Sequence, residues 1–182
     1  MNNAMTDMIE ACRQGCKQAQ LTLYERYANK LYNACLRILG NSGEAEEAMQ
    51  DVFLKIFSRI NQYRMGHNFE AWMQRIAVNT AIDYLRRRDV EWEELPINYA
   101  APVDDGDDIE ADYASVQLEV QRVRNAVIKL PPGYRVVLSL YLFEGYDMDE
   151  IASILKIQPT SVRTQYLRAK RKLLELLTNN NL

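Results

Sequence analysis

The chain has 182 residues, of which 48% are hydrophobic and 26% are charged, and its net charge is −3. This length accommodates one or two domains with apolar cores, and the composition excludes a disordered chain, a collagen and a disulfide scaffold. No run approaches the roughly 18 apolar residues of a membrane span, and the first residues lack the basic end and continuous apolar core expected of a signal peptide. We therefore expect a cytoplasmic protein without membrane insertion, whose Cys12, Cys16 and Cys35 are reduced core residues.

The small net charge hides an uneven distribution. Residues 1–88 carry a net charge of +3, and residues 119–182 carry +4. Between them, residues 89–118 hold ten acidic side chains and no basic one. Two basic blocks joined by an acidic segment favour a polyanion as the partner.

The first basic block is predicted to be helical throughout, because apolar residues recur in it at helical spacing. One stripe ends at Gly40, a residue typical of helix C-termini. Asn41 and Glu44 then have the spacing of a capping box, which predicts the start of another helix. The predicted helices cover residues 4–18, 21–39, 41–60 and 69–88.

The periodicity disappears after this block. Prolines, a glycine and a cluster of four aspartates mark residues 89–112 as an acidic flexible linker. No strand pattern of consequence is present anywhere in the chain. We therefore predict an all-α fold of two small helical domains, residues 1–88 and 113–182, joined by this linker.

The second basic block ends in two short helices separated by a three-residue turn. Asp147 and Glu150 predict the N-terminal cap of the first, and Pro159 suits the first position of the second. A turn of only Lys156-Ile157-Gln158 between them has the layout of a helix-turn-helix, whose second helix enters the major groove of DNA. The predicted helices of this block cover residues 116–130, 134–143, 147–155 and 159–177.

The two faces of the last helix differ in chemistry. At about 100° per residue, the side predicted to pack inward carries Val162, Tyr166, Ala169 and Leu173. The opposite side carries Thr160, Thr164, Leu167, Arg168 and Arg171, with Arg163 on its flank. Arginine can bind guanine edges, a threonine hydroxyl can bond to bases, and leucine can contact a thymine methyl, while Lys170 and Lys172 are placed for phosphates. The alternative is an amphipathic helix whose charges are only hydrated.

Aromatic and basic residues also interleave in the first block, at Tyr63, His67, Phe69, Trp72, Arg75 and the run Arg86–Arg88. Such a pattern suits single-stranded nucleic acid, because bases stack on rings while arginine contacts the backbone. Core packing is the alternative, and for Phe69 and Trp72 it is the favoured interpretation.

Catalytic and metal chemistry find no support in the sequence. One histidine in the whole chain gives no credible tetrahedral metal set with the cysteines. No phosphate-binding glycine-rich loop or nucleophile-elbow pattern is present. We expect a protein that is not an enzyme and that uses no cofactor, no metal and no catalytic residue.

Five stretches of the chain form a combined pattern: Leu54–Phe57, Ala71–Arg87, Leu130–Pro132, Glu150–Ala152 and Val162–Leu173. Taken together, they resemble the bacterial extracytoplasmic-function sigma factors of the sigma-70 family. The resemblance covers essentially the whole chain, in order. It implies a transcription initiation factor that binds core RNA polymerase, recognises both promoter elements and helps to melt the duplex.

The resemblance also implies roles for particular residues. The polymerase beta-prime clamp would bind Asp51, Phe53, Lys55 and Ile56, and the beta flap would contact the second domain. The minus-ten element would be bound by Arg64, His67, Asn68, Phe69, Asn79, Arg86 and Arg87, which include the part that captures a flipped base. The minus-thirty-five element would be read by Arg163, Thr164, Leu167 and Arg168, with Arg171 on the same outward face. An anti-sigma factor is a further expected partner.

Two other functions compete with this interpretation. A sigma-like mimic would sequester an anti-sigma factor without binding DNA, but it would be expected to lose the outward arginines that this chain keeps. A stand-alone helix-turn-helix regulator would leave the long first helical block unexplained.

Overall fold

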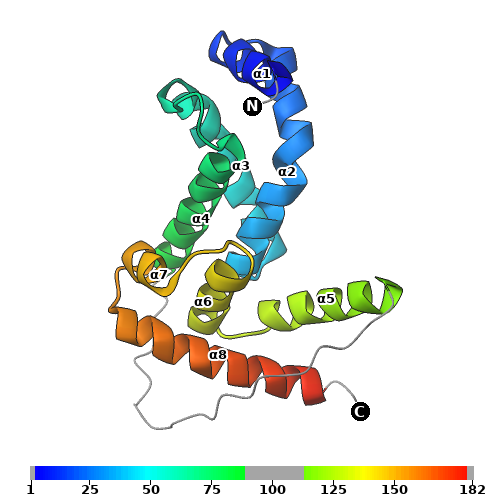
Figure 1. The fold of residues 1–182 in the computed structure, drawn as a ribbon, viewed down its shortest axis with the longest axis vertical. Helices are drawn as coiled ribbons and strands as arrows, with labels where there is room; N and C mark the ends of the chain where they lie inside the picture. Colours follow the sequence, from blue (N-terminus) through cyan, green and yellow to red (C-terminus); the bar gives the residue numbers. More distant parts are fainter. Residues whose placement is uncertain (1–2, 89–112, 180–182) are drawn as a thin grey trace. The chain divides into compact units, whose positions relative to one another are not determined.

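The computed structural model describes residues 3–88 and 113–179, and in these ranges the regular structure is helical, without strands. The chain divides into two compact units, one on each side of a boundary at Asp89. The predicted all-α class with two helical units is therefore confirmed (Figure 1). The predicted acidic linker, residues 89–112, lies outside the described residues, and each unit is described by itself.

The N-terminal unit is built on three helices that pack against one another, α2 (Lys17–Leu39), α3 (Ser42–Arg59) and α4 (Phe69–Arg87). A short 3-10 turn, η1 (Ile60–Gln62), follows α3 directly. The core contains large apolar side chains from all three helices, including Leu23, Leu31, Ile38, Ile56, Met73, Ile82 and Leu85. The helix α1 (Asn3–Arg13) packs on α2 and η1.

The ends of these helices follow the predicted signals. Gly40 adopts a left-handed conformation, with φ of 70°, and its amide donates to the carbonyl of Leu36 at 2.8 Å. This geometry suits glycine, because it has no Cβ to collide with the backbone. The side chain of Asn41 then accepts a hydrogen bond from the amide of Glu44 at 3.1 Å, which begins α3.

One predicted core residue is misplaced. Cys12 and Cys35 are buried as expected, but Cys16 is exposed. The prediction assumed one continuous helix over residues 4–18, whereas α1 ends at Arg13 and Gly15 makes a turn with φ of 77°. The spacing of one helical turn between Cys12 and Cys16 therefore does not put them on one face, and Cys16 is the residue just before α2.

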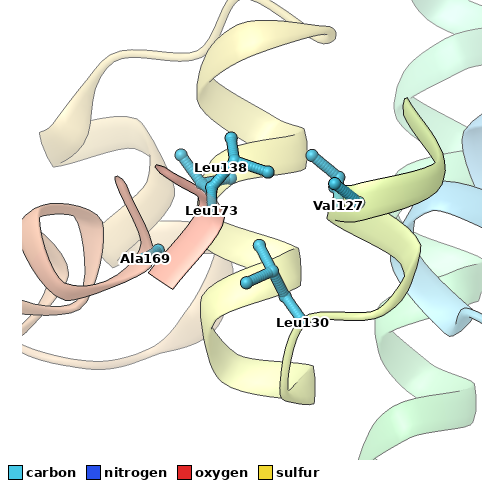
Figure 2. Packing of buried hydrophobic residues seen from close by; sticks show 6 residues of the cluster. Val127, Leu130, Leu138, Ala169 and Leu173 are labelled. Carbon is cyan, nitrogen blue, oxygen red and sulfur yellow. The ribbon is translucent and has the colours of Figure 1, made fainter. Parts of the chain in front are cut away.

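The C-terminal unit comprises α5 (Tyr113–Ile128), α6 (Pro132–Leu142), α7 (Met148–Leu155) and α8 (Pro159–Asn179). Its core joins α5, α6 and α8, and Figure 2 shows Val127, Leu130, Leu138, Ala169 and Leu173 meeting there. The helix α6 begins at Pro132, two residues earlier than predicted, because proline is favoured in the first turn of a helix.

A buried arginine fixes the connection between α5 and α6. Arg135 is 7% exposed, and its Nη1 atom donates to the carbonyls of Ile128 and Leu130 at 3.2 and 2.9 Å. The last carbonyls of a helix have no partner within the helix, so the guanidinium satisfies groups that burial would otherwise leave unpaired. Arg135 therefore holds the end of α5 against the start of α6.

This contact predicts a stability effect. Replacing Arg135 by Met keeps the apolar stem but removes both charge-assisted hydrogen bonds, so we expect a loss of about 2 kcal/mol in the stability of the C-terminal unit. Amide hydrogen exchange in α6 and α8 measures it. The control is R124M, a substitution at an exposed position of α5, for which we expect a change within about 0.5 kcal/mol. Equal effects of the two substitutions would contradict the role of Arg135.

Candidate nucleic-acid and partner interface

The helices α7 and α8 form the predicted helix-turn-helix, with Lys156–Gln158 as the turn (Figure 1). The capping box at the start of α7 is present in both directions. The Asp147 carboxylate accepts from the amide of Glu150 at 2.8 Å, and the Glu150 carboxylate accepts from the amide of Asp147 at 3.0 Å. At the other end of α7, Lys156 is left-handed, with φ of 59°, and the amide of Ile157 donates to the Ala152 carbonyl. These contacts fix where α8 starts.

Packing of α8 agrees with the predicted inward face. Val162, Ala169 and Leu173 are buried and Tyr166 is partly buried. The ring of Tyr166 lies against Tyr141 of α6, with 4.8 Å between ring centroids. Burial raises the pKa of Tyr166, so this residue stays neutral inside the unit.

The outward face of α8 presents an apolar side chain between two cationic ones. Leu167 is 51% exposed, and Arg163 and Arg171 are exposed on either side of it along the helix. Thr164 and Arg168 are only partly exposed, and the Thr164 hydroxyl donates to the Thr160 carbonyl at 2.9 Å. Arg163, Leu167 and Arg171 are therefore the most exposed of the residues predicted to bind the minus-thirty-five element.

The charges on α8 are only loosely paired. Arg163 lies 3.9 Å from Asp149 of α7, and both side chains are largely exposed. Glu175 lies 3.7 Å from Arg171 and 2.9 Å from Lys172, and the hydrogen bond from Lys172 lowers the pKa of Glu175. Exposed ion pairs are worth about 0–1 kcal/mol, so a phosphate or a base edge can replace these partners.

In the N-terminal unit, the predicted loop is exposed while the residue that follows it is not. Arg64, His67 and Asn68 are exposed, and the Asn68 side chain accepts from the amide of Ala71 at 3.1 Å, which caps α4. Phe69 is buried and stacks on the partly buried Trp72 at 5.5 Å between centroids. Core packing, the favoured interpretation of the sequence, therefore holds for Phe69.

One line of exposed side chains runs along α4. Arg75, Asn79 and Arg86 are exposed, and with the partly buried Trp72 they fall on one face at spacings of three, four and seven residues. We call these four residues the α4 stripe. It spans about 21 Å at 1.5 Å per residue. Arg86 also pairs with Asp83 at 3.4 Å.

The predicted minus-ten residues are thus spread along the unit. Asn79 lies ten residues after Phe69, which is about 15 Å along the axis of α4, so it is not next to the loop. Arg87 lies over the ring of Tyr84, 5.5 Å from its centroid. Arg75, which sequence reasoning noticed but did not assign, joins the predicted Asn79 and Arg86 because all three share one face.

The four residues predicted to bind polymerase are engaged within the fold. The Tyr84 hydroxyl donates to Asp51 at 2.9 Å, and Lys55 donates to the buried Thr80 hydroxyl at 2.9 Å, which ties α3 to α4. Ile56 is fully buried and Phe53 is 4% exposed. Ile56 and Phe53 therefore belong to the core beneath the exposed side of α3 and are not themselves accessible to a partner.

The exposed apolar residues of this region lie beside them. Leu54 is 68% exposed, and Leu21 and Tyr24 of α2 are also exposed. The rings connect the two helices, because Phe53 lies 4.7 Å from Tyr24 and 6.0 Å from Phe57 between centroids. We call Leu21, Tyr24, Leu54 and Phe57 the α2–α3 apolar surface. Sequence reasoning missed Leu54 as a site residue, although its position off the apolar stripe of α3 was the available signal.

The described ranges, residues 3–88 and 113–179, offer neither a metal site nor a membrane-spanning helix. No group of three histidine, cysteine or acidic side chains there is placed to hold a metal ion. None of the helices in the same ranges has the length and hydropathy needed to cross a bilayer.

Comparison with known proteins relates both units of the chain to the sigma factors of RNA polymerase. Residues 23–90 match the family described as Sigma-70 region 2, and residues 120–173 match Sigma-70, region 4. The chain is 30% identical to the ECF RNA polymerase sigma factor SigW of Bacillus subtilis, over 91% of this chain and 92% of the relative. It is 29% identical to the ECF RNA polymerase sigma-E factor of Haemophilus influenzae, over 93% and 94%.

Two solved structures share the fold. One is CnrH in complex with the cytosolic domain of CnrY, with a TM-score of 0.53 and 23% identity over 94% of this chain and 96% of that one. The other is the sigma factor RpoE in complex with the anti-sigma factor NepR from Bartonella quintana, with a TM-score of 0.53 and 19% identity over 86% and 95%.

The cap of α7 yields a test of the helix-turn-helix geometry. Asp147→Ala removes the acceptor for the amides of Asp149 and Glu150, so we expect the C-terminal unit to lose about 1 kcal/mol. Hydrogen exchange of α7 amides measures this loss. Asp147→Asn is the matched control, because asparagine caps helices about as well. The cap is not responsible if Asn and Ala at this position behave alike.

Proposed function

Because this chain belongs to the extracytoplasmic-function sigma factors of RNA polymerase, it is a transcription initiation factor, and we propose a division of its work between the two units. The N-terminal unit binds core polymerase and the minus-ten element, and the C-terminal unit reads the minus-thirty-five element through α8. The observation that carries this proposal is the exposure of Arg163 and Leu167 on the second helix of a helix-turn-helix whose other face is buried.

Recognition by α8 follows from the chemistry of its free face. The major groove is wide enough for a helix, and it offers the guanine O6 and N7 acceptors and the thymine methyl group. Arg163 supplies paired donors for a guanine, and Leu167 supplies an apolar contact for a methyl group. Lys170 and Lys172 then contact phosphates, which position the helix without reading sequence.

Binding of the minus-ten element is assigned to the exposed loop at residues 64–68 and to the α4 stripe. An arginine or asparagine every one or two turns suits a nucleic-acid strand, because cations contact phosphates while rings and amides contact bases. The partly buried Trp72 offers an aromatic edge between the loop and Arg75. A strand held along this line stays separated from its complement, which is the work of promoter melting.

Polymerase binding is assigned to the α2–α3 apolar surface, with Asp51 and Lys55 beside it. Exposed apolar clusters with a polar rim are typical of protein–protein sites. The resemblance to the family implies that the beta-prime clamp binds α3, and we propose that the beta flap contacts the C-terminal unit, whose α6 exposes Tyr141 and Leu142. The fully buried Ile56 contributes by seating α3 in the core of the unit.

The remaining expectations follow from membership of the family. Sigma factors are regulatory proteins, and we propose that this chain acts by binding alone. We place it in the cytoplasm with the polymerase, and we propose an anti-sigma factor as its partner, by analogy with the complex of the sigma factor RpoE and the anti-sigma factor NepR. A mimic that only sequesters an anti-sigma factor would not need the exposed Arg163.

The polymerase surface is tested with Leu54→Arg. A charge placed in a desolvated contact costs about 2 kcal/mol or more, so we expect at least tenfold weaker co-elution of the full chain with core RNA polymerase. Asn29→Arg is the control, since it adds the same charge at an exposed position of α2 well round the helix from Tyr24. Leu54 is a sharper choice than Phe53, because truncating the buried Phe53 leaves a cavity. Wild-type affinity in L54R would refute the assignment.

The DNA-reading face is tested by selecting promoters from a random-sequence library with the wild-type holoenzyme. Arg163→Ala should relax the preference at one base pair of the minus-thirty-five element, by about 1–3 kcal/mol. Lys170→Ala should weaken binding to all sequences alike and reduce the salt dependence. The readout is transcript yield from promoters randomised at each position. If R163A keeps the wild-type base preferences, α8 does not read sequence through this residue.

A further inference from the structure

The loop between η1 and α4, residues 64–68, is held at both ends by side chains from the N-terminal unit. At its start, Arg13 of α1 donates to the carbonyls of Ile60 and Tyr63, at 3.3 and 2.5 Å. At its end, the Tyr63 hydroxyl donates to the carbonyl of His67, directly before the residue that caps α4. The two ends of the loop backbone are therefore held by Arg13 and Tyr63. The exposed side chains of the loop take no part in these contacts.

The contact from α1 comes from a helix that apolar packing holds in place. Ile9 is fully buried and Cys12 is 3% exposed, so they seat α1 on α2 and η1. Arg13 is the last residue of this helix, and its side chain is 21% exposed. A guanidinium presents its donors in a fixed fork, which suits two neighbouring carbonyls. The helix α1 also lies outside residues 23–90, the part matched to Sigma-70 region 2.

The contact from Tyr63 is equally constrained. Its ring is 3% exposed and lies edge-on to Phe69 at 4.9 Å and tilted against Trp72 at 5.4 Å. These rings direct the hydroxyl toward the carbonyl of His67. Burial raises the pKa of Tyr63, so the hydroxyl keeps its proton and remains a donor around neutral pH.

We propose that Arg13 and Tyr63 are positioning residues for the loop at residues 64–68, which is assigned to the minus-ten element. They hold the backbone of residues 64–67 in one conformation, so that Arg64 and His67 meet unpaired bases on a loop that is already ordered. Binding to an ordered loop avoids the entropy cost of fixing it at the moment of contact. This inference rests on the proposed function, because it assumes that the loop binds the minus-ten strand.

The test uses Tyr63→Phe in the full chain, which keeps the ring and removes only the hydroxyl. Holoenzyme binding is measured with a fluorescent single-stranded oligonucleotide that carries the minus-ten element of promoters selected by the wild type. We expect a loss of roughly three- to tenfold, the value of one hydrogen bond. Discrimination among bases at the position facing the loop should fall as well, while affinity for core polymerase stays within twofold.

Two further substitutions sharpen the result. Arg13→Lys keeps the charge but not the fork, and it should reproduce the effect of Y63F on base discrimination. Tyr32→Phe makes the same chemical change at a partly buried position of α2 and should leave binding at the wild-type level. Hydrogen exchange of amides 64–70 in the free chain should quicken in Y63F and R13K but not in Y32F.

The outcomes separate this inference from the function on which it rests. If the wild-type holoenzyme selects no promoter, the proposed function fails. If promoters are selected but Y63F and R13K bind the strand with wild-type affinity and base preference, the positioning role fails. It also fails if the loss of strand binding is matched by equal losses in core binding and in exchange protection throughout the unit, because that pattern indicates a structural role only.

Discussion

The burial of one face of α8 decides what the C-terminal unit can touch. Ala169 and Leu173 meet Val127 of α5, Leu130 of the connection after α5 and Leu138 of α6, and Val162 is buried nearer the start of α8. A helix seated by three turns of apolar contact cannot rotate about its axis without exposing them to water. The arginines of the opposite face are therefore presented in a fixed orientation. The capping box of α7 helps to fix where the helix-turn-helix begins, and so where α8 starts.

The same constraint operates on α4 in the N-terminal unit. Met73, Ile76, Ala77 and Leu85 are buried against neighbouring helices, which leaves Arg75, Asn79 and Arg86 outside. Lys55 and Thr80, together with Asp51 and Tyr84, fasten this helix to α3 by hydrogen bonds between side chains. The surface assigned to polymerase and the surface assigned to DNA are thus two sides of one rigid body.

The sequence predicted the features that depend on local chemistry. Helical periodicity located the helices, and Gly40, Asn41 and Asp147 marked their ends correctly, because capping is a short-range effect. It could not predict contacts between distant segments. The hydrogen bonds from Arg13 to residues 60 and 63, and the burial of Arg135, depend on tertiary packing. Cys16 was misplaced because a single turn at Gly15 broke the assumed helix. Phe53 and Ile56 were predicted to bind polymerase but are buried, whereas Leu54, which lies off the apolar stripe of α3, is exposed beside them.

The geometry of Gly66 has a consequence for how this protein can change. A Cβ at this position would meet no atom within 4 Å, but the backbone has φ of 98°, which disfavours every residue with a side chain. Its neighbours Arg64, Met65 and His67 are exposed and bear little of the packing. Within this loop, side chains can therefore be exchanged at three positions around a glycine whose backbone conformation tolerates little else. Recognition can therefore be altered by substitutions on the surface of this loop, while its backbone and the core of the unit stay as they are.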